Sequence, residues 1–301
     1  METQIYRLWT RAPRGFRHLP ILSMTLAANA ALAAGAASSA DAPAASAHRS
    51  SVAHIRAVTA KVDANMIRAN ATSTKDWPTY GLNYAETRFS NLRQITDANV
   101  KNLGLVWSYD LESTRGVEAT PLVVDGIMYV TAPWSIVHAI DVRTGKRLWT
   151  YDPQVRRDLG YKACCDVVNR GVALYKGKVF VGALDDRLIA LDAATGKPRW
   201  EVNTVIDPSR SYTITGAPRV FNGNVMIGNS GAEYDVRGYL TAYDAVSGRQ
   251  KWRWFTVPGD PSKPFENEAM ARAAKTWDPS ARWRVAAERS GTRWHSTRNS
   301  T

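Results

Sequence analysis

Cysteine is scarce in this sequence: its 301 residues contain two, and they are neighbours, Cys164 and Cys165. Because neither has a distant partner, a disulfide cannot close a long loop and stabilise the chain through the entropy of the unfolded state. Consecutive Cα atoms lie about 3.8 Å apart, less than the usual disulfide span, so a bond between them would form a strained ring. Such strain suggests a functional site, and the alternative is a pair of buried free thiols.

The sequence also lacks an extended basic run. Its formal net charge is +12, but more than half of this excess comes from residues 1–40 and 281–301. The remaining positive charge is spread thinly over the middle of the chain. We therefore expect no nucleic-acid partner.

Phenylalanine is sparse, whereas the other aromatic residues are abundant. The chain has 6 Phe against 11 Trp and 12 Tyr. Trp and Tyr favour strands, so this surplus indicates a β-rich architecture in which Trp holds a recurring structural position.

The N-terminal region predicts export. Residues 1–40 combine an Arg-bearing start, an apolar stretch and small residues that offer an A-x-A-like cleavage site. Pro20, Asn29 and Gly35 interrupt the apolar stretch, so we predict a cleaved signal peptide over 1–40 and no stable membrane anchor. Export to the periplasm would allow a disulfide to persist. Residues 41–75, rich in Ala, Ser and Thr, are predicted to form a flexible lead-in.

Three segments align without gaps and share the pattern A-x-D-x-x-[TS]-G-x-x-x-W. They are VHAIDVRTGKRLWTYD from Val137, LIALDAATGKPRWEVN from Leu188 and LTAYDAVSGRQKWRWF from Leu240. Their aspartates, Asp141, Asp192 and Asp244, recur about every fifty residues, a period typical of propellers and repeat arrays. Each segment follows an alternating apolar run around a turn, with Asp125-Gly126, Lys176-Gly177 and Asn222-Gly223 as the expected hairpin positions.

Each repeat therefore predicts a four-stranded blade. The Asp side chain can accept backbone N–H groups of the following turn, and Gly145, Gly196 and Gly248 supply its positive φ. We expect Trp149, Trp200 and Trp252 to pack between neighbouring blades as structural residues. The fold class predicted is all-β, an incomplete β-propeller over residues 76–280.

With these repeats, the motifs ACCDVVNRG, GVEATPLVVDGIMYV, YTITGAPRV and IGNSGAEYDVRGYLTAYD resemble the periplasmic quinoprotein alcohol dehydrogenases, including quinohaemoprotein forms. The resemblance covers residues 76–279. It implies about half of an eight-bladed propeller that holds pyrroloquinoline quinone (PQQ) and calcium on its axis and oxidises primary alcohols to aldehydes. A sugar quinoprotein dehydrogenase is a weaker alternative, because GVEATP and ACCDVVNRG follow the alcohol-type pattern.

The resemblance assigns site residues position by position. Cys164 and Cys165 match a vicinal disulfide whose ring packs on the planar quinone, and Arg170 matches the residue that pairs with a cofactor carboxylate. Glu233 matches a calcium ligand, a hard oxygen donor. The other positions expected to contact the cofactor are Glu118, Thr215, Ser230, Gly231 and Ala232.

The chemistry implied is oxidation of a small alcohol, with electrons passing to a cytochrome c-type acceptor. Calcium would polarise a quinone carbonyl while a carboxylate base takes the hydroxyl proton. A lanthanide is an alternative metal. Haem c is expected only with a downstream domain, because the sequence has no C-x-x-C-H motif.

No segment matches the family's catalytic Asp, its second calcium ligand or the Trp that forms the other wall of the quinone site, so no catalytic base is assigned. Residues 281–301 show no apolar periodicity. With suitable synonymous codons, reading them one nucleotide earlier from Trp283 restores a glycine-rich turn and a family-like Trp, which predicts an out-of-frame tail. As written, the chain is expected to be inactive and to bind PQQ weakly. The alternative from another functional class is a non-catalytic propeller scaffold of the outer-membrane assembly type, but the lipobox cysteine of those proteins is missing.

Overall fold

The computed structural model describes residues 49–277. The predicted signal peptide (1–40), the first part of the predicted lead-in and the predicted out-of-frame tail (281–301) lie outside these residues. Within the described part, no helix combines the length and apolarity needed to span a bilayer.

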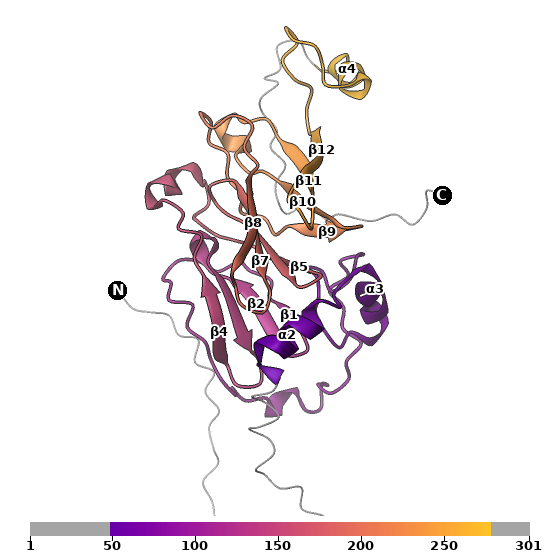
Figure 1. The fold of residues 1–301 in the computed structure, drawn as a ribbon, viewed down its shortest axis with the longest axis vertical. Helices are drawn as coiled ribbons and strands as arrows, with labels where there is room; N and C mark the ends of the chain where they lie inside the picture. Colours follow the sequence, from indigo (N-terminus) through magenta and orange to yellow (C-terminus); the bar gives the residue numbers. More distant parts are fainter. Residues whose placement is uncertain (1–48, 278–301) are drawn as a thin grey trace, which may run out of the picture. The chain divides into compact units, whose positions relative to one another are not determined.

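Three antiparallel four-stranded sheets follow one another along the chain, from magenta through orange in Figure 1. Each is one blade with its strands in sequence order. The first contains β1 (Leu122–Val124), β2 (Ile127–Thr131), β3 (Val137–Asp141) and β4 (Lys146–Tyr151). The second contains β5 (Ala173–Tyr175), β6 (Lys178–Gly182), β7 (Arg187–Asp192) and β8 (Pro198–Asn203). The third contains β9 (Arg219–Phe221), β10 (Asn224–Gly228), β11 (Tyr239–Asp244) and β12 (Gln250–Phe255). The predicted all-β, partial-propeller fold is thus confirmed.

The two turn types of each blade form as the sequence predicts. Both residues of each two-residue hairpin turn have positive φ, for example 47° at Asp125 and 76° at Gly126. In the turn between the third and fourth strands, Asp192 Oδ1 accepts the backbone N–H of Ala194 at 3.1 Å, and Gly196 has φ 71°. These turns lie at one end of each blade, and the loops between blades lie at the other.

Tryptophan connects each blade to the next. The Nε1 of Trp149 donates to the carbonyl oxygen of Ala193 at 3.1 Å, and that of Trp200 donates to Ala245 at 3.4 Å. Each indole covers the turn glycine of the following blade, where an added Cβ would lie less than 3 Å from the ring. The predicted packing of Trp149 and Trp200 between blades is therefore confirmed.

The predicted packing of Trp252 between blades is wrong within the described residues. Trp252 is 43% exposed, and no later blade among those residues covers it. Conversely, Trp107, which lies outside the three aligned repeats, has this docking role. Its Nε1 donates to the Val142 carbonyl at 2.7 Å, and its ring covers Gly145 in the same way.

The predicted flexible lead-in is incorrect over most of its described length. Helices α2 (Val52–Thr59) and α3 (Ala64–Ser73), indigo in Figure 1, form there. Ser51 caps the first helix and Asp63 caps the second through their side-chain oxygens. Ile55 and Val62 join the core of the first two blades. This burial, reinforced by a bond from Gly177 N to Thr59 O at 2.9 Å, orders a segment whose composition resembles a linker.

The remaining helices are short. They are α4 (Glu268–Ala274) and the 3₁₀ helices η1 (Val100–Asn102), η2 (Pro133–Ser135), η3 (Arg157–Lys162) and η4 (Ala232–Tyr234). Of these, η3 precedes the cysteine pair and η4 contains Glu233. Both lie in the loops at the end of the blades opposite the Asp-x-x-Thr/Ser-Gly turns.

Candidate functional site

The blade topology brings the expected site residues to one end of the sheets. Cys164, Cys165 and Arg170 lie between β4 and β5, and Thr215 lies between β8 and β9. Residues 230–233 lie between β10 and β11, whereas Glu118 precedes β1. In an up-and-down antiparallel sheet, all of these connections open on the same side. Residues that are more than 100 positions apart in sequence can therefore form one site.

Arg170 is the centre of a polar network. Its Nη2 lies 2.9 Å from Glu118 Oε2, and its Nη1 donates to Thr215 Oγ1 at 2.7 Å. Thr215 Oγ1 lies in turn 3.2 Å from Ser230 Oγ. Four of the expected cofactor-binding residues are thus joined by direct contacts, although they come from the segment before the first blade, the two connections between blades and the third blade.

Backbone bonds hold these side chains in register. Arg170 N donates to Thr215 O at 2.9 Å, and Thr120 N donates to Arg170 O at 3.2 Å. Ser230 forms an antiparallel bridge with Thr213. The guanidinium is consequently aimed from a fixed backbone instead of from a free loop.

Cys164 and Cys165 are joined in a disulfide, and both are exposed. This overturns the alternative of two buried free thiols. The two Sγ atoms and a carboxylate oxygen of Glu233 all lie within 4.8 Å of one another. The disulfide therefore lies next to the expected metal ligand, although 68 positions of sequence separate Cys165 from Glu233.

The donor chemistry restricts how this trio can bind a metal. Thiolates are the sulfur ligands of metals, and disulfide sulfurs carry no such charge. Glu233 alone supplies a hard oxygen suited to calcium or a similar ion. Of the three residues, only Glu233 therefore has the donor chemistry expected of a ligand to a hard cation.

Gly231 allows the backbone to approach closely before Glu233. It has φ 113°, and a Cβ there would lie 2.5 Å from the carbonyl oxygen of Ser211 and 2.8 Å from a methyl group of Val236. A side chain is thus excluded by both space and conformation. Ala232, which is half-buried, starts η4 directly after this glycine.

Asn169, which lies in the ACCDVVNRG motif and was not among the expected site residues, positions Arg170. It is 2% exposed, and its Nδ2 donates to Ser135 Oγ at 3.1 Å and to Gly182 O at 2.9 Å. Its Oδ1 accepts Gly171 N at 3.0 Å. The signal in the sequence for this role was an Asn followed by Arg-Gly. Gly171 has φ 127°, and the hydrogen bond to the Asn169 side chain supports that backbone conformation.

A basic and aromatic group borders the disulfide loop and was also missed. Arg115 pairs with Asp166, directly after Cys165, and Arg115 and Arg157 both lie over the ring of Trp134. A hydrogen bond from Val167 N, followed by the Arg115 contact, lowers the pKa of Asp166. Trp134 N donates to Val167 O at 2.9 Å, which ties the loop to η2.

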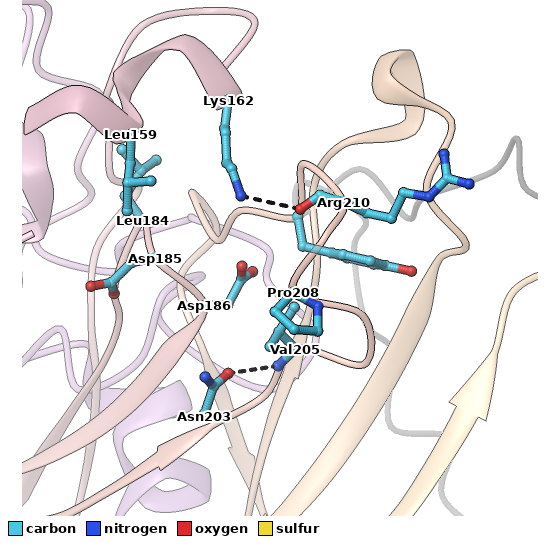
Figure 2. A pocket seen from close by; sticks show the side chains of 10 residues that line it. Leu159, Lys162, Leu184, Asp185, Asp186, Asn203, Val205, Pro208 and Arg210 are labelled. Atoms are coloured by element: carbon cyan, nitrogen blue, oxygen red, sulfur yellow. Dashed lines mark hydrogen bonds between the residues drawn. The ribbon is translucent and has the colours of Figure 1, made fainter. Parts of the chain in front are cut away.

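A cavity of about 120 Å³ lies between η3, the β6–β7 turn and the segment that leads from β8 to Thr213. Figure 2 shows its lining side chains, with Lys162 and the carboxyl group of Asp186 both directed inward. None of the predicted site residues lines it. The cavity is therefore separate from the Arg170 network. The two are nevertheless close in sequence, because η3 shortly precedes Arg170 and residues 210–212 shortly precede Thr215.

Residues 77–286 match the PQQ family described as "Glucose/ethanol/alcohol dehydrogenase, beta-propeller domain". The quinohemoprotein alcohol dehydrogenase of Comamonas testosteroni is 67% identical over 253 residues, covering 84% of this chain and 36% of that protein. The "1-butanol dehydrogenase (cytochrome c)" of Thauera butanivorans is 66% identical over 204 residues, covering 68% of this chain and 29% of that protein.

Solved structures agree with these matches. The crystal structure of the C. testosteroni enzyme has a TM-score of 0.74 at 70% identity, covering 76% of this chain and 34% of that one. A structure titled "Europium-containing methanol dehydrogenase" has a TM-score of 0.60 at 39% identity, covering 65% and 34%. The chain thus spans about a third of the length of the relatives it matches.

Proposed function

Because this chain belongs to the PQQ family of glucose, ethanol and alcohol dehydrogenase β-propellers, we propose that it forms part of a periplasmic quinoprotein that oxidises primary alcohols to aldehydes. Its share of that function is to bind and orient PQQ and to supply one ligand to the metal ion. The observation that carries the proposal is the single network in which Arg170 joins Glu118 and Thr215 beside the Cys164–Cys165 disulfide.

The residues present fit an anionic, planar cofactor. Arg170 offers a planar donor group suited to a carboxylate, and the hydroxyls of Thr215 and Ser230 can donate or accept beside it. The exposed disulfide offers a surface without a reactive thiolate. Gly231, which has no room for a Cβ, leaves the backbone of 231–232 accessible for close approach.

The residues also fit one side of a metal site. Glu233 is exposed beside the disulfide, and no Lys or Arg side chain within residues 49–277 forms an ion pair with it. We propose calcium as the ion, with a lanthanide as the alternative because one similar structure is titled as europium-containing. Further ligands must come from the cofactor and from residues outside those described.

When bound, PQQ would supply a hydride acceptor for alcohol oxidation, and the metal ion would supply Lewis-acid chemistry. The described residues bind and orient: Arg170 holds a carboxylate, Glu118 and Thr215 fix the guanidinium, and the disulfide limits tilt of the ring. We assign no catalytic base to residues 49–277. Turnover is therefore proposed to need the remainder of the propeller, and this chain alone is expected to bind PQQ weakly.

The partners proposed are a small primary alcohol and a cytochrome c-type acceptor. A relative named as a cytochrome c-linked 1-butanol dehydrogenase and others named quinohemoproteins support this proposal. A haem c would belong to a part of the protein outside residues 49–277. The export-type N-terminal sequence supports a periplasmic location.

A chimaera tests the proposal. Residues 77–277 of this chain would replace the aligned segment of the C. testosteroni enzyme, whose identity of 67% favours a compatible fold. We expect the purified chimaera to bind PQQ at near one equivalent and to oxidise 1-butanol with an artificial acceptor. A chimaera that folds, as judged by circular dichroism and cooperative melting, but binds no PQQ would contradict the proposal.

A further inference from the structure

The cavity of about 120 Å³ beside the Arg170 network contains a buried carboxyl oxygen that has no partner. Asp186 is 6% exposed, and no group among the described residues hydrogen-bonds its Oδ1. A buried polar atom without a partner costs free energy unless a ligand or solvent satisfies it. The position is fixed by the β6–β7 turn, where Asp186 N donates to Ala183 O at 3.0 Å and Thr204 N donates to Asp186 O at 2.9 Å.

An ammonium group faces the same cavity. Lys162, the last residue of η3, donates through Nζ to the backbone oxygen of Arg210 at 3.2 Å (Figure 2). An ammonium carries three donors, and the structure gives this one a single hydrogen bond. The cavity therefore presents spare donor capacity and an unsatisfied acidic oxygen together.

The other walls mix apolar and polar groups. Leu159, Leu184, Val205, Pro208 and the ring of Tyr212 supply apolar surface, whereas Asp185, Asn203 and Arg210 supply polar groups. These three already have partners: Asp185 pairs with Arg187, Asn203 Oδ1 accepts Val205 N, and Arg210 pairs with Asp207 and Asp235. The Tyr212 hydroxyl is already used, because it donates to Arg237 O at 3.2 Å. A ligand that combines a small apolar body with one polar group matches the apolar surface and the two side chains, Lys162 and Asp186, that retain hydrogen-bonding capacity.

A hydroxyl group meets these requirements. It can accept a hydrogen bond from Lys162 and donate one to Asp186, and it can also accept from Asp186 when that carboxyl is protonated. An ammonium ligand has no acceptor for Lys162, and a carboxylate has no donor for an ionised Asp186, although it could accept from both groups when Asp186 is protonated. Burial, reinforced by Asp185 and opposed by Lys162, raises the pKa of Asp186 to about 8. The ionised form, which distinguishes a hydroxyl from a carboxylate ligand, therefore prevails above about pH 8.

We propose that this cavity is a second binding site for a short-chain alcohol, whose hydroxyl bridges Lys162 and Asp186 and whose alkyl group packs on the apolar walls. A cavity of about 150 Å³ is large enough to bind benzene, so one of about 120 Å³ suits a slightly smaller ligand such as a three-carbon alcohol. The site does not require PQQ or a metal ion. It is therefore independent of the function proposed above.

An alcohol bound here contacts the two segments that lead to the Arg170 network. Lys162 lies two residues before Cys164, and Tyr212 lies three residues before Thr215. The existing bond between Lys162 and Arg210 already links these segments, and the ligand adds a second link. Occupancy thus stabilises the loops that carry the disulfide and the threonine.

The test compares three probes of equal size on the full 301-residue chain without PQQ, at about pH 9 where Asp186 is ionised: 1-propanol, 1-propylammonium and acetate. Saturation-transfer NMR and titration of protein amide resonances report binding. We expect 1-propanol to bind at least fivefold more tightly than either charged probe. Equal or tighter binding of acetate or 1-propylammonium would overturn the assignment of a hydroxyl ligand, and no binding of 1-propanol would overturn the site.

Two variants locate the binding. Asp186→Gly removes the carboxyl group at a position whose φ of 68° suits glycine, and Lys162→Met removes the ammonium while keeping an unbranched apolar side chain. Each is expected to weaken 1-propanol binding at least fivefold, whereas Lys146→Met, at an exposed lysine outside the cavity, leaves it unchanged. Unaltered binding in both cavity variants, with native-like spectra, would overturn the proposal.

Discussion

The guanidinium of Arg170 donates to the hydroxyl of Thr215 at 2.7 Å, across 45 positions of sequence and between two successive blades. The same two residues also share a backbone bond of 2.9 Å from Arg170 N to Thr215 O. Side chain and backbone are thus fixed relative to each other. This double connection orients the central cation of the candidate site before any cofactor binds.

Arg170→Lys should weaken PQQ binding in the chimaera. Lysine is a point charge that cannot reproduce the planar pair of donors, and bonds to charged groups contribute about 1.5–3 kcal/mol. We expect about a tenfold or greater rise in the Kd for PQQ by fluorescence titration. Arg156→Lys is the matched control, because Arg156 is exposed and pairs with Asp158 outside the network; an equal loss there would remove the special role of Arg170.

Gly231→Ala should destabilise the chain more than Gly223→Ala. Both glycines have positive φ, which costs an alanine about 1–2 kcal/mol. A Cβ at 231 also meets Ser211 O at 2.5 Å, whereas nothing lies within 4 Å of one at 223. Urea denaturation of both variants measures the difference, and equal midpoints would show that the loop before Glu233 relaxes without cost.

Removing the vicinal disulfide should affect cofactor binding more than stability. A bond between neighbours closes no long loop, so its loss in a Cys164→Ser/Cys165→Ser variant should change the free energy of unfolding by less than about 1 kcal/mol. In the chimaera, the same double variant should bind PQQ at least fivefold more weakly because the packing surface is lost. A large fall in melting temperature with unchanged PQQ affinity would assign the disulfide a structural role instead.

Trp149→Ala should cost about 3–5 kcal/mol of unfolding free energy, as for other large buried side chains. Trp149 is 8% exposed and bonded to Ala193 in the next blade, so its loss opens the interface between two blades. Trp252→Ala is the control: it occupies the same position in the repeat but is 43% exposed, and we expect less than half the effect. Comparable losses in chemical denaturation would contradict the docking role.

Asp186→Asn should make stability less dependent on pH. Burial raises the pKa of Asp186 to about 8, above its value in the unfolded chain. The folded state therefore holds this proton more tightly, and the wild-type chain loses stability as pH rises from about 4 to about 8. The variant should lose less over that range, as measured by urea denaturation at successive pH values.

Asp244→Asn should change the pH dependence of stability in the opposite direction to Asp186→Asn, and at lower pH. Hydrogen bonds from the backbone and side chain of Ser247 lower the pKa of Asp244 to about 2, so its ionised form favours the folded state. That contribution is present above about pH 4 and is lost as pH falls toward 2. The Asp244 variant should therefore alter only the acidic limb, and a change in the same window as Asp186→Asn would contradict both assignments.

Local repeats were readable from sequence because their determinants lie close together along the chain. Asp192, Thr195 and Gly196 form one turn, and Asp192 Oδ1 accepts from Ala194 N and from the Thr195 hydroxyl as the pattern predicts. The helices over 52–73 were missed for the opposite reason. This segment is rich in Ala, Ser and Thr, and the few large apolar residues that order it, such as Ile55 and Val62, are buried only against blades that lie far away in sequence.

The sequence by itself determined the repeat, its turns and, through resemblance, the residues of the candidate site. Only the tertiary structure decided which of these residues meet: it joined Arg170 to Glu118 and Thr215, placed Glu233 beside the disulfide and left Trp252 exposed. It also created the cavity around Asp186, which no motif marks. Turn formation depends on neighbours within a few positions, whereas burial and long-range contacts depend on how whole blades pack.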